Sequence, residues 1–455
     1  MGVSRVSGEV LQKALASVRR QSFSDFEFLI LENGVQDPAV SSILEKAAQE
    51  DPRIRLLTSQ TPLGLSGASN RLLSEGKGEF VVFVDHDDEI PPQALAEVAA
   101  AIRRWPESDW FFSDEDTLSA EGIHGKPCLK LGFSRHLLLC WNYAAHLRVV
   151  RREKALALGG HRWGFEGAQD WDLALRFLAS GAVFRHIPKV LYHWRKVAGS
   201  MALGAAAKPT AQKAAARAVA EVVGSLVPDS KVQVSPLVPG ASQFSVVWQA
   251  PADLGVTLLT ADATPLPSWP RRHEVLKVEG WDDAASVLKA LASARFEAVV
   301  VLPPRGLNAA ALESLLSYLS FPNTAAAGGR CVRRGKVLAS GFLLDEEGIL
   351  RDPEAGFPTA DPGYCNLAWL PHPRTVLLPY AFAAWRQDLL EGLTKAHPLP
   401  MPWRLTAGLA DLNRECVVVP NVTFSAPPPP WPSTPLTLPA QGFFWRRELE
   451  LFGLA

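Results

Sequence analysis

Two aspartates stand directly after a short apolar run of the chain. The run covers 80–84, and Asp85 and Asp87 follow it with one residue between them. An apolar run of this length predicts a buried strand of a parallel sheet, and ligands bind at the carboxyl ends of such strands. Residues i and i+2 of an extended chain point the same way, so both carboxylates can face one divalent cation. That cation could neutralise a departing diphosphate, although Asp-x-Asp is short and common enough to be an acidic surface turn.

The composition excludes several classes of protein. The 455 residues are 47% hydrophobic and 20% charged, with a formal net charge of −1. These values are typical of a soluble globular protein of two or three domains, without a global field that favours nucleic acid. The five cysteines form no C-x-x-C pair and indicate buried thiols in a reducing compartment. We find no signal-peptide pattern and no apolar stretch of about 20 residues, and therefore expect a cytoplasmic protein.

The first half of the chain alternates helical and strand patterns. Helical spacing of apolar residues occurs at 9–20, 39–50 and 91–104, and strand candidates lie at 26–31, 54–57, 80–84 and 110–113. This order predicts an α/β domain with a mostly parallel sheet. The last strand candidate ends in the acidic run 114–116, for which a solvated turn is the default interpretation. Gly64 opens a Gly/Ser loop in which backbone N–H groups could approach phosphate, and Ser66 is a candidate N-cap for the helix that follows.

Blocks of sequence across the first two hundred residues resemble the family 2 glycosyltransferases, which have the GT-A fold. The matching blocks, in chain order, are 23–28, 64–70, 84–89, 112–116, 164–173 and 186–195. The pattern is most similar to bacterial enzymes of surface-polysaccharide assembly, such as O-antigen or rhamnan transferases. This resemblance implies transfer of a sugar from a nucleoside-diphosphate donor to a saccharide or lipid-linked saccharide acceptor, with inversion and with Mn²⁺ or Mg²⁺ as the cofactor.

The resemblance also implies roles for individual residues. Asp85 and Asp87 match the Asp-x-Asp motif that meets the donor and the metal ion, and His193 matches a histidine that can complete the metal or diphosphate site. Asp170 matches the acid that deprotonates the acceptor hydroxyl. From the residues alone, Asp170 could instead be a helix N-cap and His193 a buried core histidine. His86, between the two aspartates, should point the other way and be structural.

Further positions are candidates for the donor and acceptor sites. Asn70 matches a position near the donor in relatives, and the Gly64 loop could approach the donor phosphate, although a generic turn before a helix is equally possible. Glu166 and Trp171 flank the expected base and could shape the acceptor pocket. Relatives carry an acidic pair after the second strand, and the segment 31–33 leaves Glu32 as its substitute. A surface charge is the alternative interpretation of Glu166.

The start of the chain departs from the family pattern. Relatives open with an apolar strand inside the sheet, whereas residues 1–8 are short and polar. Loss of that strand would leave two neighbouring strands unpaired. We therefore expect the first strand to be missing, either because the true start lies upstream of Met1 or because part of the donor site has been lost.

The second half resembles a degenerate copy of the first. After a linker rich in proline and valine at 226–244, the segment 297–302 parallels 79–84. Pro303 then stands in place of Asp85 and Arg305 in place of Asp87, and a guanidinium cannot ligate Mg²⁺. The interpretation is a degenerate GT-A-like module at 245–426 that serves as scaffold, acceptor platform or dimer surface.

The end of the chain is a tail at 427–455. It is rich in proline and closes with a candidate amphipathic helix at 443–452. Docking on its own domain is the default for such a helix. The alternatives are binding to a partner or peripheral association with the inner face of the plasma membrane, for which two adjacent arginines are thin electrostatic support.

The sequence therefore predicts an α/β protein with a catalytic GT-A domain at 1–225, followed by the linker, the degenerate module and the tail. The expected partners are the nucleotide sugar, the acceptor and a second copy of the chain. The alternative is a non-catalytic scaffold or binding protein built on glycosyltransferase modules. A haloacid dehalogenase-like phosphohydrolase is disfavoured, because that family has Thr or Val two residues past its second aspartate and this chain has Glu89.

Overall fold

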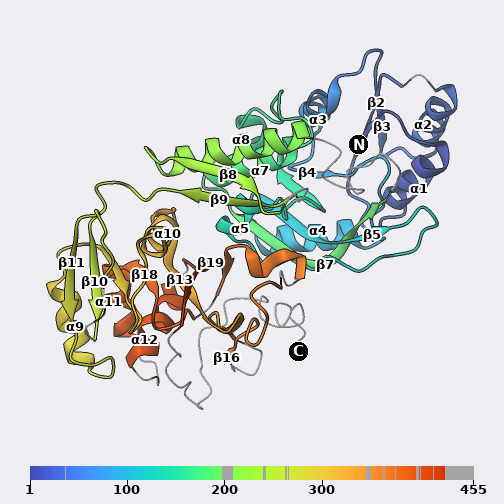
Figure 1. Ribbon diagram of the computed structural model, residues 1–455. Helices are drawn as coiled ribbons and strands as arrows, with labels where there is room; N and C mark the ends of the chain where they lie inside the picture. The colour runs from blue at the N-terminus through green and yellow to red at the C-terminus, as the bar shows by residue number, and fades with distance from the viewer. Residues whose placement is uncertain are drawn as a thin grey trace. The chain divides into compact units, whose positions relative to one another are not determined.

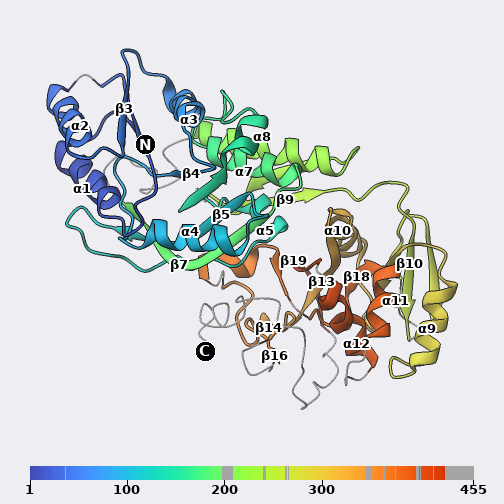
Figure 2. The same ribbon diagram turned by 180° about the vertical axis from the view of Figure 1, so that it is seen from behind.

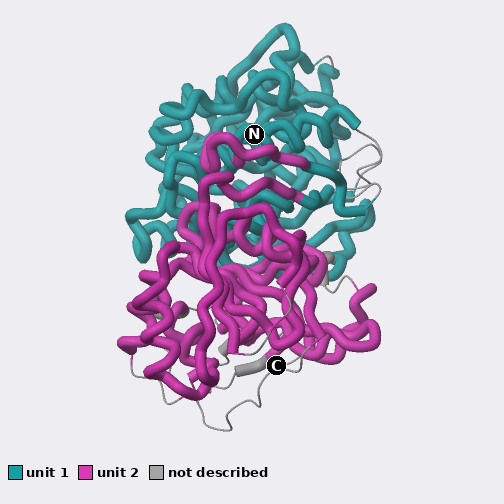
Figure 3. The backbone as a smooth tube through the Cα atoms, turned by 60° about the vertical axis from the view of Figure 1, so that its left-hand side comes forward, with its two compact units in different colours: residues 1–222, 234–245 teal, residues 223–233, 246–455 magenta. Residues whose placement is uncertain are grey.

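The structure, a computed structural model, divides into two compact units. It describes residues 1–35, 37–196, 209–238, 242–261, 264, 266–344, 350–361, 364–374, 376–395, 399, 401–412 and 414–425. The first unit comprises 1–222 and 234–245, and the second comprises 223–233 and 246–455 (Figure 3). The chain passes between them within α8 (Pro209–Leu226), β8 (Val232–Pro236) and β9 (Phe244–Trp248), so part of the expected linker is a strand. The expected tail at 427–455 lies outside the described residues.

A three-stranded parallel sheet opens the first unit. Its strands are β1 (Gly2–Val3), β2 (Phe28–Asn33) and β3 (Ile54–Ser59), in that order. Two helices, α1 (Gly8–Arg19) and α2 (Pro38–Glu50), lie on one side of β2 and β3, and α3 (Gly64–Glu75) lies on the other (Figures 1 and 2). Apolar side chains at helical spacing on α1 and α2 are buried against Ile30 of β2.

The start of the chain bears on the expected loss of the first strand. Gly2 and Val3 pair in parallel with Leu31 and Glu32, and the amino group of Met1 donates to the Leu29 carbonyl, 2.9 Å away. Within the described residues this two-residue strand pairs with β2 alone, and β4 (Phe80–Phe83) belongs to a separate sheet, so the edge that a full first strand would share with β4 is not paired. The polarity of the rest of 1–8 is explained by the start of α1 after Ser7, which caps the helix.

A mixed four-stranded sheet follows. Its order is β4 (Phe80–Phe83), β6 (Arg148–Arg151), β5 (Trp110–Leu118) and β7 (Phe184–Arg195). Strand β6 is antiparallel to both neighbours, whereas β5 and β7 are parallel. The expectation of a mostly parallel sheet is therefore wrong for this part, because the short strand β6 had no sequence signal of its own. Strand β5 also continues to Leu118 instead of ending at Ser113, since β7 supplies partners for its acidic residues.

Helices complete the first unit around this sheet. They are α4 (Ala94–Arg104), α5 (Arg135–Cys140), α6 (Arg152–Ala157), α7 (Gln169–Ala179) and α8. Trp110 of β5 is fully buried, and its ring contacts Phe177 of α7 and Phe184 of β7 at 5.1 and 5.4 Å between centroids. Aromatic packing of this kind fixes α7, and with it Asp170, against the sheet.

The second unit is built on an eight-stranded sheet. Its order is β11-β10-β12-β18-β13-β19-β17, with β14 paired to β13 outside this path. The strands are β10 (Val256–Thr260), β11 (His273–Lys277), β12 (Ala298–Val301), β13 (Thr324–Arg333), β14 (Lys336–Ala339), β17 (His372–Pro373), β18 (Phe382–Trp385) and β19 (Glu415–Phe424), and a separate pair is β15 (Leu343–Leu344) with β16 (Leu350–Arg351). The helices are α9 (Ala284–Ser293), α10 (Ala309–Ser320), α11 (Arg386–Thr394) and α12 (Met401–Ala407), and the 3-10 helices are η3 (Tyr364–Trp369) and η4 (Gly408–Leu412).

The two units repeat one strand arrangement. The set β12-β18-β13-β19 has the same antiparallel, antiparallel and parallel pairings as β4-β6-β5-β7, and both long parallel pairs contain register shifts. Strands β6 and β18 each lead into a helix whose first residue donates its main-chain N–H to the main-chain carbonyl of a glutamate. Arg152 donates to the Glu79 carbonyl at 2.9 Å, and Arg386 donates to the Glu297 carbonyl at 2.7 Å. This agreement supports the internal repeat that the sequence suggested.

A buried ionic cluster stabilises the second unit. Glu354 is fully buried and accepts from Arg330 and Arg374 at 3.0 and 2.7 Å, while His372 Nε2 lies 2.7 Å from the same carboxylate. Burial alone would raise the pKa of Glu354, but His372 and the two guanidinium groups outweigh it and lower the pKa to about 2. The carboxylate therefore compensates charges that would otherwise be buried unpaired.

Glu354→Gln should destabilise the second unit by about 3–5 kcal/mol, because it leaves two guanidinium groups in the interior without a counter-charge. Urea unfolding curves measure this loss. Glu297→Gln is the matched control: its carboxylate is 58% exposed in an ion pair with Arg386, so the change should stay below about 1 kcal/mol.

The pH dependence of this difference follows from the lowered pKa of Glu354. Its contribution should be complete above pH 4.5, the ordinary value, and should shrink as the pH falls toward 2. A difference between wild type and Glu354→Gln that stays constant over this range would contradict the role given to the carboxylate.

Candidate functional site

The Asp-x-Asp segment follows β4 at the carboxyl end of the strand. Asp85 is exposed and its main-chain N–H donates to the Tyr192 hydroxyl at 3.3 Å. Asp87 is half-buried, and Asp88 is buried. Asp88 accepts from the Tyr192 hydroxyl at 2.6 Å and from the Arg195 main-chain N–H at 2.7 Å. The turn is therefore anchored to the end of β7 through Asp88, a residue that the sequence analysis did not select.

Negative charge is concentrated in this turn. Burial, together with the charges of Asp85 and Asp87, raises the pKa of Asp88 to about 7. Burial and the nearby Asp85 also raise the pKa of Asp87. A bound cation would offset the charge that opposes the ionisation of Asp87 and Asp88. Carboxylate oxygens are also the ligand type that the implied divalent ion takes.

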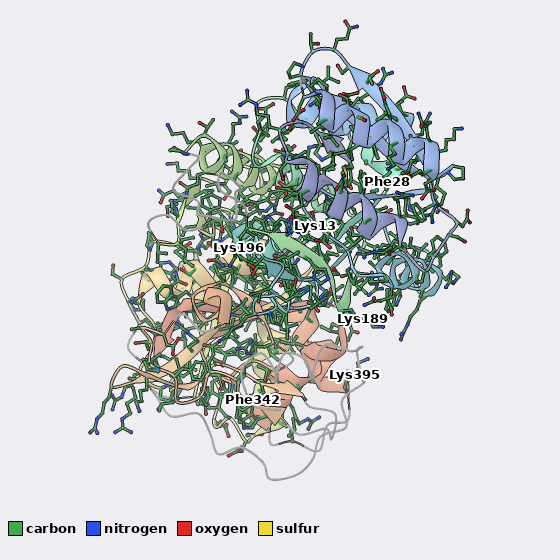
Figure 4. The ribbon with its side chains drawn as sticks, turned by 90° about the vertical axis from the view of Figure 1, so that its right-hand side faces the viewer. Lys13, Phe28, Lys189, Lys196, Phe342 and Lys395 are labelled. Atoms are coloured by element: carbon green, nitrogen blue, oxygen red, sulfur yellow. The ribbon has the colours of Figure 1, made fainter. Side chains whose placement is uncertain are left out.

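The end of β7 is bound to this turn at several points. The Arg195 side chain is buried, donates to the Asp87 carbonyl at 3.0 Å and forms an ion pair with Glu89. The main chains of Glu89 and His193 exchange hydrogen bonds of 3.2 and 2.9 Å. Figure 4 shows the course of this strand between Lys189 and Lys196.

The neighbouring His86 takes the structural role that was expected of it. Its Nδ1 lies 3.0 Å from the carbonyl oxygen of Gly2, in the short strand β1. The imidazole therefore links the Asp-x-Asp turn to the three-stranded sheet.

His193 does not contact the Asp-x-Asp carboxylates. Its Nδ1 lies 2.6 Å from Asp116 Oδ1, and His124 Nδ1 lies 2.9 Å from Asp116 Oδ2. Within the described residues, the only other hydrogen bonds of His193 are those to the Glu89 main chain. The expected metal set of Asp85, Asp87 and His193 is thus divided between two neighbouring clusters.

The acidic run on β5 is buried and paired, which corrects the expected solvated turn. Glu115 Oε2 lies 2.8 Å from His146 Nδ1 and 3.2 Å from Lys130 Nζ. Burial would raise the pKa of Glu115, but Lys130 and His146 lower it to about 2. Burial lowers the pKa of His146, and the Glu115 charge outweighs this effect and raises it. Asp114 accepts from the main chain of Lys130 at 2.8 Å.

The expected base, Asp170, lies in the first turn of α7. The N-cap position belongs to Ala168, so the capping alternative for Asp170 is not realised. Its carboxylate accepts from Asn142 Nδ2 at 3.0 Å and lies 3.8 Å from the Arg148 guanidinium. The side chain is 23% exposed, and its Oδ1 also accepts from the Trp171 main-chain N–H at 2.8 Å. Asn142, in the segment between α5 and β6, and Arg148, the first residue of β6, orient the Asp170 carboxylate.

Asn70 and Ser66 hold two segments of chain together. Asn70 accepts from the His161 main-chain N–H at 2.7 Å and donates to its carbonyl at 2.8 Å. Ser66 is buried inside α3, and its hydroxyl donates to the Arg162 carbonyl at 3.1 Å, so it is not the N-cap. The N-cap of α3 is Leu63, and Gly64 begins the helix at φ +69°. The amide of Asn70, expected near the donor, therefore has a structural use.

Three other selected residues also have partners within the protein. Trp171 is buried, donates from Nε1 to the Leu138 carbonyl at 2.8 Å and stacks on Phe244, so packing replaces the expected acceptor contact. Glu166 accepts from the Gly164 main-chain N–H at 3.1 Å. Glu32 accepts from the hydroxyl of Ser41 in α2.

Asn70→Ala should destabilise the first unit by about 1–3 kcal/mol, because the main-chain groups of His161 lose their partners. Urea unfolding measures this loss, and Ser74→Ala, an exposed change on the same helix, should cost little. Nucleotide affinity of the folded variant should stay within about twofold of wild type. A large loss of affinity at unchanged stability would instead return Asn70 to the donor site.

Comparisons with known proteins find similarity in the first half of the chain. Residues 5–117 match the family model Glycosyl transferase family 2. The O-antigen biosynthesis protein RfbC of Myxococcus xanthus is 38% identical over 219 residues, which are 48% of this chain and 17% of that protein. The uncharacterized protein y4gI of Sinorhizobium fredii is 35% identical over 214 residues, 47% of this chain and 24% of that protein. The chain thus spans less than a quarter of the length of either relative.

Two further comparisons concern a shorter matching segment and a solved structure. The GalNAc(5)-diNAcBac-PP-undecaprenol beta-1,3-glucosyltransferase of Campylobacter jejuni is 33% identical over 88 residues, 19% of this chain and 28% of that protein. Residues 1–349 of TarS from S. aureus, in complex with UDP-GlcNAc, align at 18% identity and a TM-score of 0.40 over 49% of this chain and 65% of that one. At this score the likeness says nothing about the ligand of this chain.

Among the described residues, no helix is both long enough and apolar enough to cross a membrane. The match at 5–117 includes the Asp-x-Asp segment and most of β5. Residues 5–117 of this chain are therefore similar to the glycosyltransferase family 2 enzymes.

Proposed function

We propose that the first unit is a metal-dependent, inverting glycosyltransferase. It moves a sugar from a nucleoside-diphosphate donor to a saccharide or lipid-linked saccharide, in the assembly of a bacterial surface polysaccharide and on the cytoplasmic side. The observation that carries the proposal is the carboxylate turn at the end of β4, anchored by Tyr192 and Arg195 inside a family 2 domain. The similarity to RfbC, an O-antigen biosynthesis protein, and to a glucosyltransferase named for an undecaprenol-linked glycan supports the acceptor class.

The donor end of the site is assigned to Asp85 and Asp87. Both carboxylates follow β4, and carboxylate oxygens suit Mn²⁺ or Mg²⁺. A bound divalent cation would neutralise charge on the departing diphosphate. Asp88 holds the turn in place through its hydrogen bonds to β7, so the two carboxylates are presented on a rigid support. Glu32 and Gly64 lie at the ends of neighbouring elements, where we place the nucleoside.

The acceptor end is assigned to Asp170. In a single displacement, the acceptor oxygen forms a bond to the anomeric carbon as the bond to the diphosphate breaks, and Asp170 takes the hydroxyl proton. Asn142 and Arg148 fix the direction of the carboxylate at 3.0 and 3.8 Å. Glu166 lies in the loop just ahead of α7 and remains a candidate acceptor contact.

The second unit is proposed to be a GT-A-like module without this chemistry. Phe83 and Val301 hold equivalent register positions, so Pro303 and Arg305 replace Asp85 and Asp87. Cys416 of β19 and Phe184 of β7 hold equivalent register positions in the two sheets. Trp403 precedes Cys416 by as many residues as Trp171 precedes Phe184. The helices α12 and α7 likewise begin at corresponding positions. Pro402 then replaces Asp170. A scaffold or acceptor platform is the role that remains for this unit.

A thermal-shift screen of the full chain tests the donor assignment. UDP, GDP, CDP and dTDP are added with and without Mn²⁺, and one of them should raise the melting temperature only when the metal is present. At a hundredfold excess over Kd, the stabilisation should be about 2.7 kcal/mol. The shift should vanish in Asp87→Ala and persist in Asp25→Ala, an exposed site in the same unit. No shift with any nucleotide would contradict a working donor site.

Asp170→Asn should lower turnover by about 10²–10⁴-fold, because the amide cannot accept the acceptor proton. Release of nucleoside diphosphate from UDP-, GDP- and dTDP-sugars measures turnover, and the nucleotide-dependent thermal shift of the variant should match wild type. Asp25→Asn is the control of the same chemistry at an exposed position. Loss of nucleotide binding together with turnover would indicate a structural role for Asp170 instead.

A further inference from the structure

We propose that Asp116, His124 and His193 bind a divalent transition-metal ion. Asp116 on β5 and His193 on β7 are register partners in the parallel pair, and His124 comes from the segment that follows β5 and bridges to Leu118. One ligand atom from each residue can be chosen so that all of them lie within 4.8 Å of one another. The inference rests on the proposed function and deepens it, since it adds a metal site next to the ion assigned to Asp85 and Asp87 and gives His193 to that second site.

The ligand types favour a particular class of ion. Two imidazoles with one carboxylate suit Mn²⁺, Fe²⁺, Co²⁺ or Zn²⁺, whereas Mg²⁺ prefers oxygen ligands alone. Both imidazoles approach the same carboxylate, with Nδ1 atoms at 2.6 and 2.9 Å from its two oxygens. The histidine rings meet edge to face at 4.6 Å between centroids, so the nitrogen atoms converge without stacking.

The charge around Asp116 points to a cation. The adjacent Glu115 lies against the ammonium group of Lys130, and Arg195, at the end of β7, pairs with Glu89. Asp116 is buried, with 8% of the residue exposed, yet it forms no ion pair with lysine or arginine within the described part of the chain. The partners of its carboxylate are the two histidines. A buried carboxylate is costly without a compensating charge, and a divalent ion would supply one.

The cluster is supported on one side and open on the other. Asp116 and His193 lie on paired strands and have 11% and 16% of their side chains exposed, which fixes two ligands rigidly. His124 is 54% exposed, so an ion can enter beside it and can keep positions for water or phosphate oxygen. The main-chain pairing of His193 with Glu89 places the cluster next to the Asp-x-Asp turn. An ion with two neutral histidines and one carboxylate stays positively charged and would attract a diphosphate.

Titration of the metal-free full chain with Co²⁺, without any nucleotide, tests this inference. Visible absorption reports nitrogen coordination of cobalt, and isothermal titration gives the affinity for Co²⁺, Mn²⁺ and Zn²⁺. We expect one nitrogen-coordinated ion per chain, and at least a tenfold loss of affinity for that ion in His124→Ala, whose exposed side chain can be removed without unfolding the protein. Asp116→Asn and His193→Ala should lose binding as well. His273→Ala, an exposed histidine of the second unit, is the matched control and should bind as wild type does.

The opposite results separate this inference from the proposed function. Absence of binding, or binding that survives His124→Ala but is lost in Asp85→Asn with Asp87→Asn, would overturn it and leave Asp116 as a residue that only orients His193. If the ion binds through the cluster but no nucleotide shifts the melting temperature, the proposed function fails and the metal site stands.

Discussion

The parallel pairing of β5 with β7 is the contact on which the chemistry of the first unit depends. It sets Asp116 beside His193, while register shifts around Asp114 keep the acidic residues of β5 within the sheet. Carboxylates are tolerated there only because each one meets a polar partner, as Glu115 does with lysine and histidine. The end of β7 then reaches the Asp-x-Asp turn through the main chain of Glu89. Strand β7 thus carries His193 and also anchors the Asp-x-Asp turn.

The second unit has the same strand pairings as the first without the carboxylates that follow β4. Its strands repeat the same pairings, including register shifts in the strand that corresponds to β5. Arg330 on β13 is the counterpart of Asp114, and it is compensated by Glu354. The frame therefore accommodates a buried charge of either sign, provided that a partner is present. The carboxylates after β4 have no counterpart after β12, where Pro303 and Arg305 stand.

The sequence predicted the parts of the fold and of the site that rest on local patterns. The alternation of helices and strands and the position of the carboxylate turn can be read from neighbouring residues, and the family model matches residues 5–117, which include that turn. Contacts between distant segments could not be read in this way. Strand β6 is short, β5 is prolonged by β7, and Asp88 acquires its role from Tyr192, more than a hundred residues away. His124 lies in a connecting segment with no pattern of its own, and Trp171 looked like an acceptor residue until its burial was known.

The proposed function places one working nucleotide site in a chain that contains two copies of the same strand arrangement. Isothermal titration of the full chain, with Mn²⁺ and the nucleoside diphosphate that stabilises it, counts these sites directly. One nucleotide per chain is predicted, with binding lost in Asp87→Asn and retained in Arg305→Ala, the equivalent position of the second unit. Two nucleotides per chain, or one whose binding is lost in Arg305→Ala and retained in Asp87→Asn, would contradict the assignment of the site to the first unit.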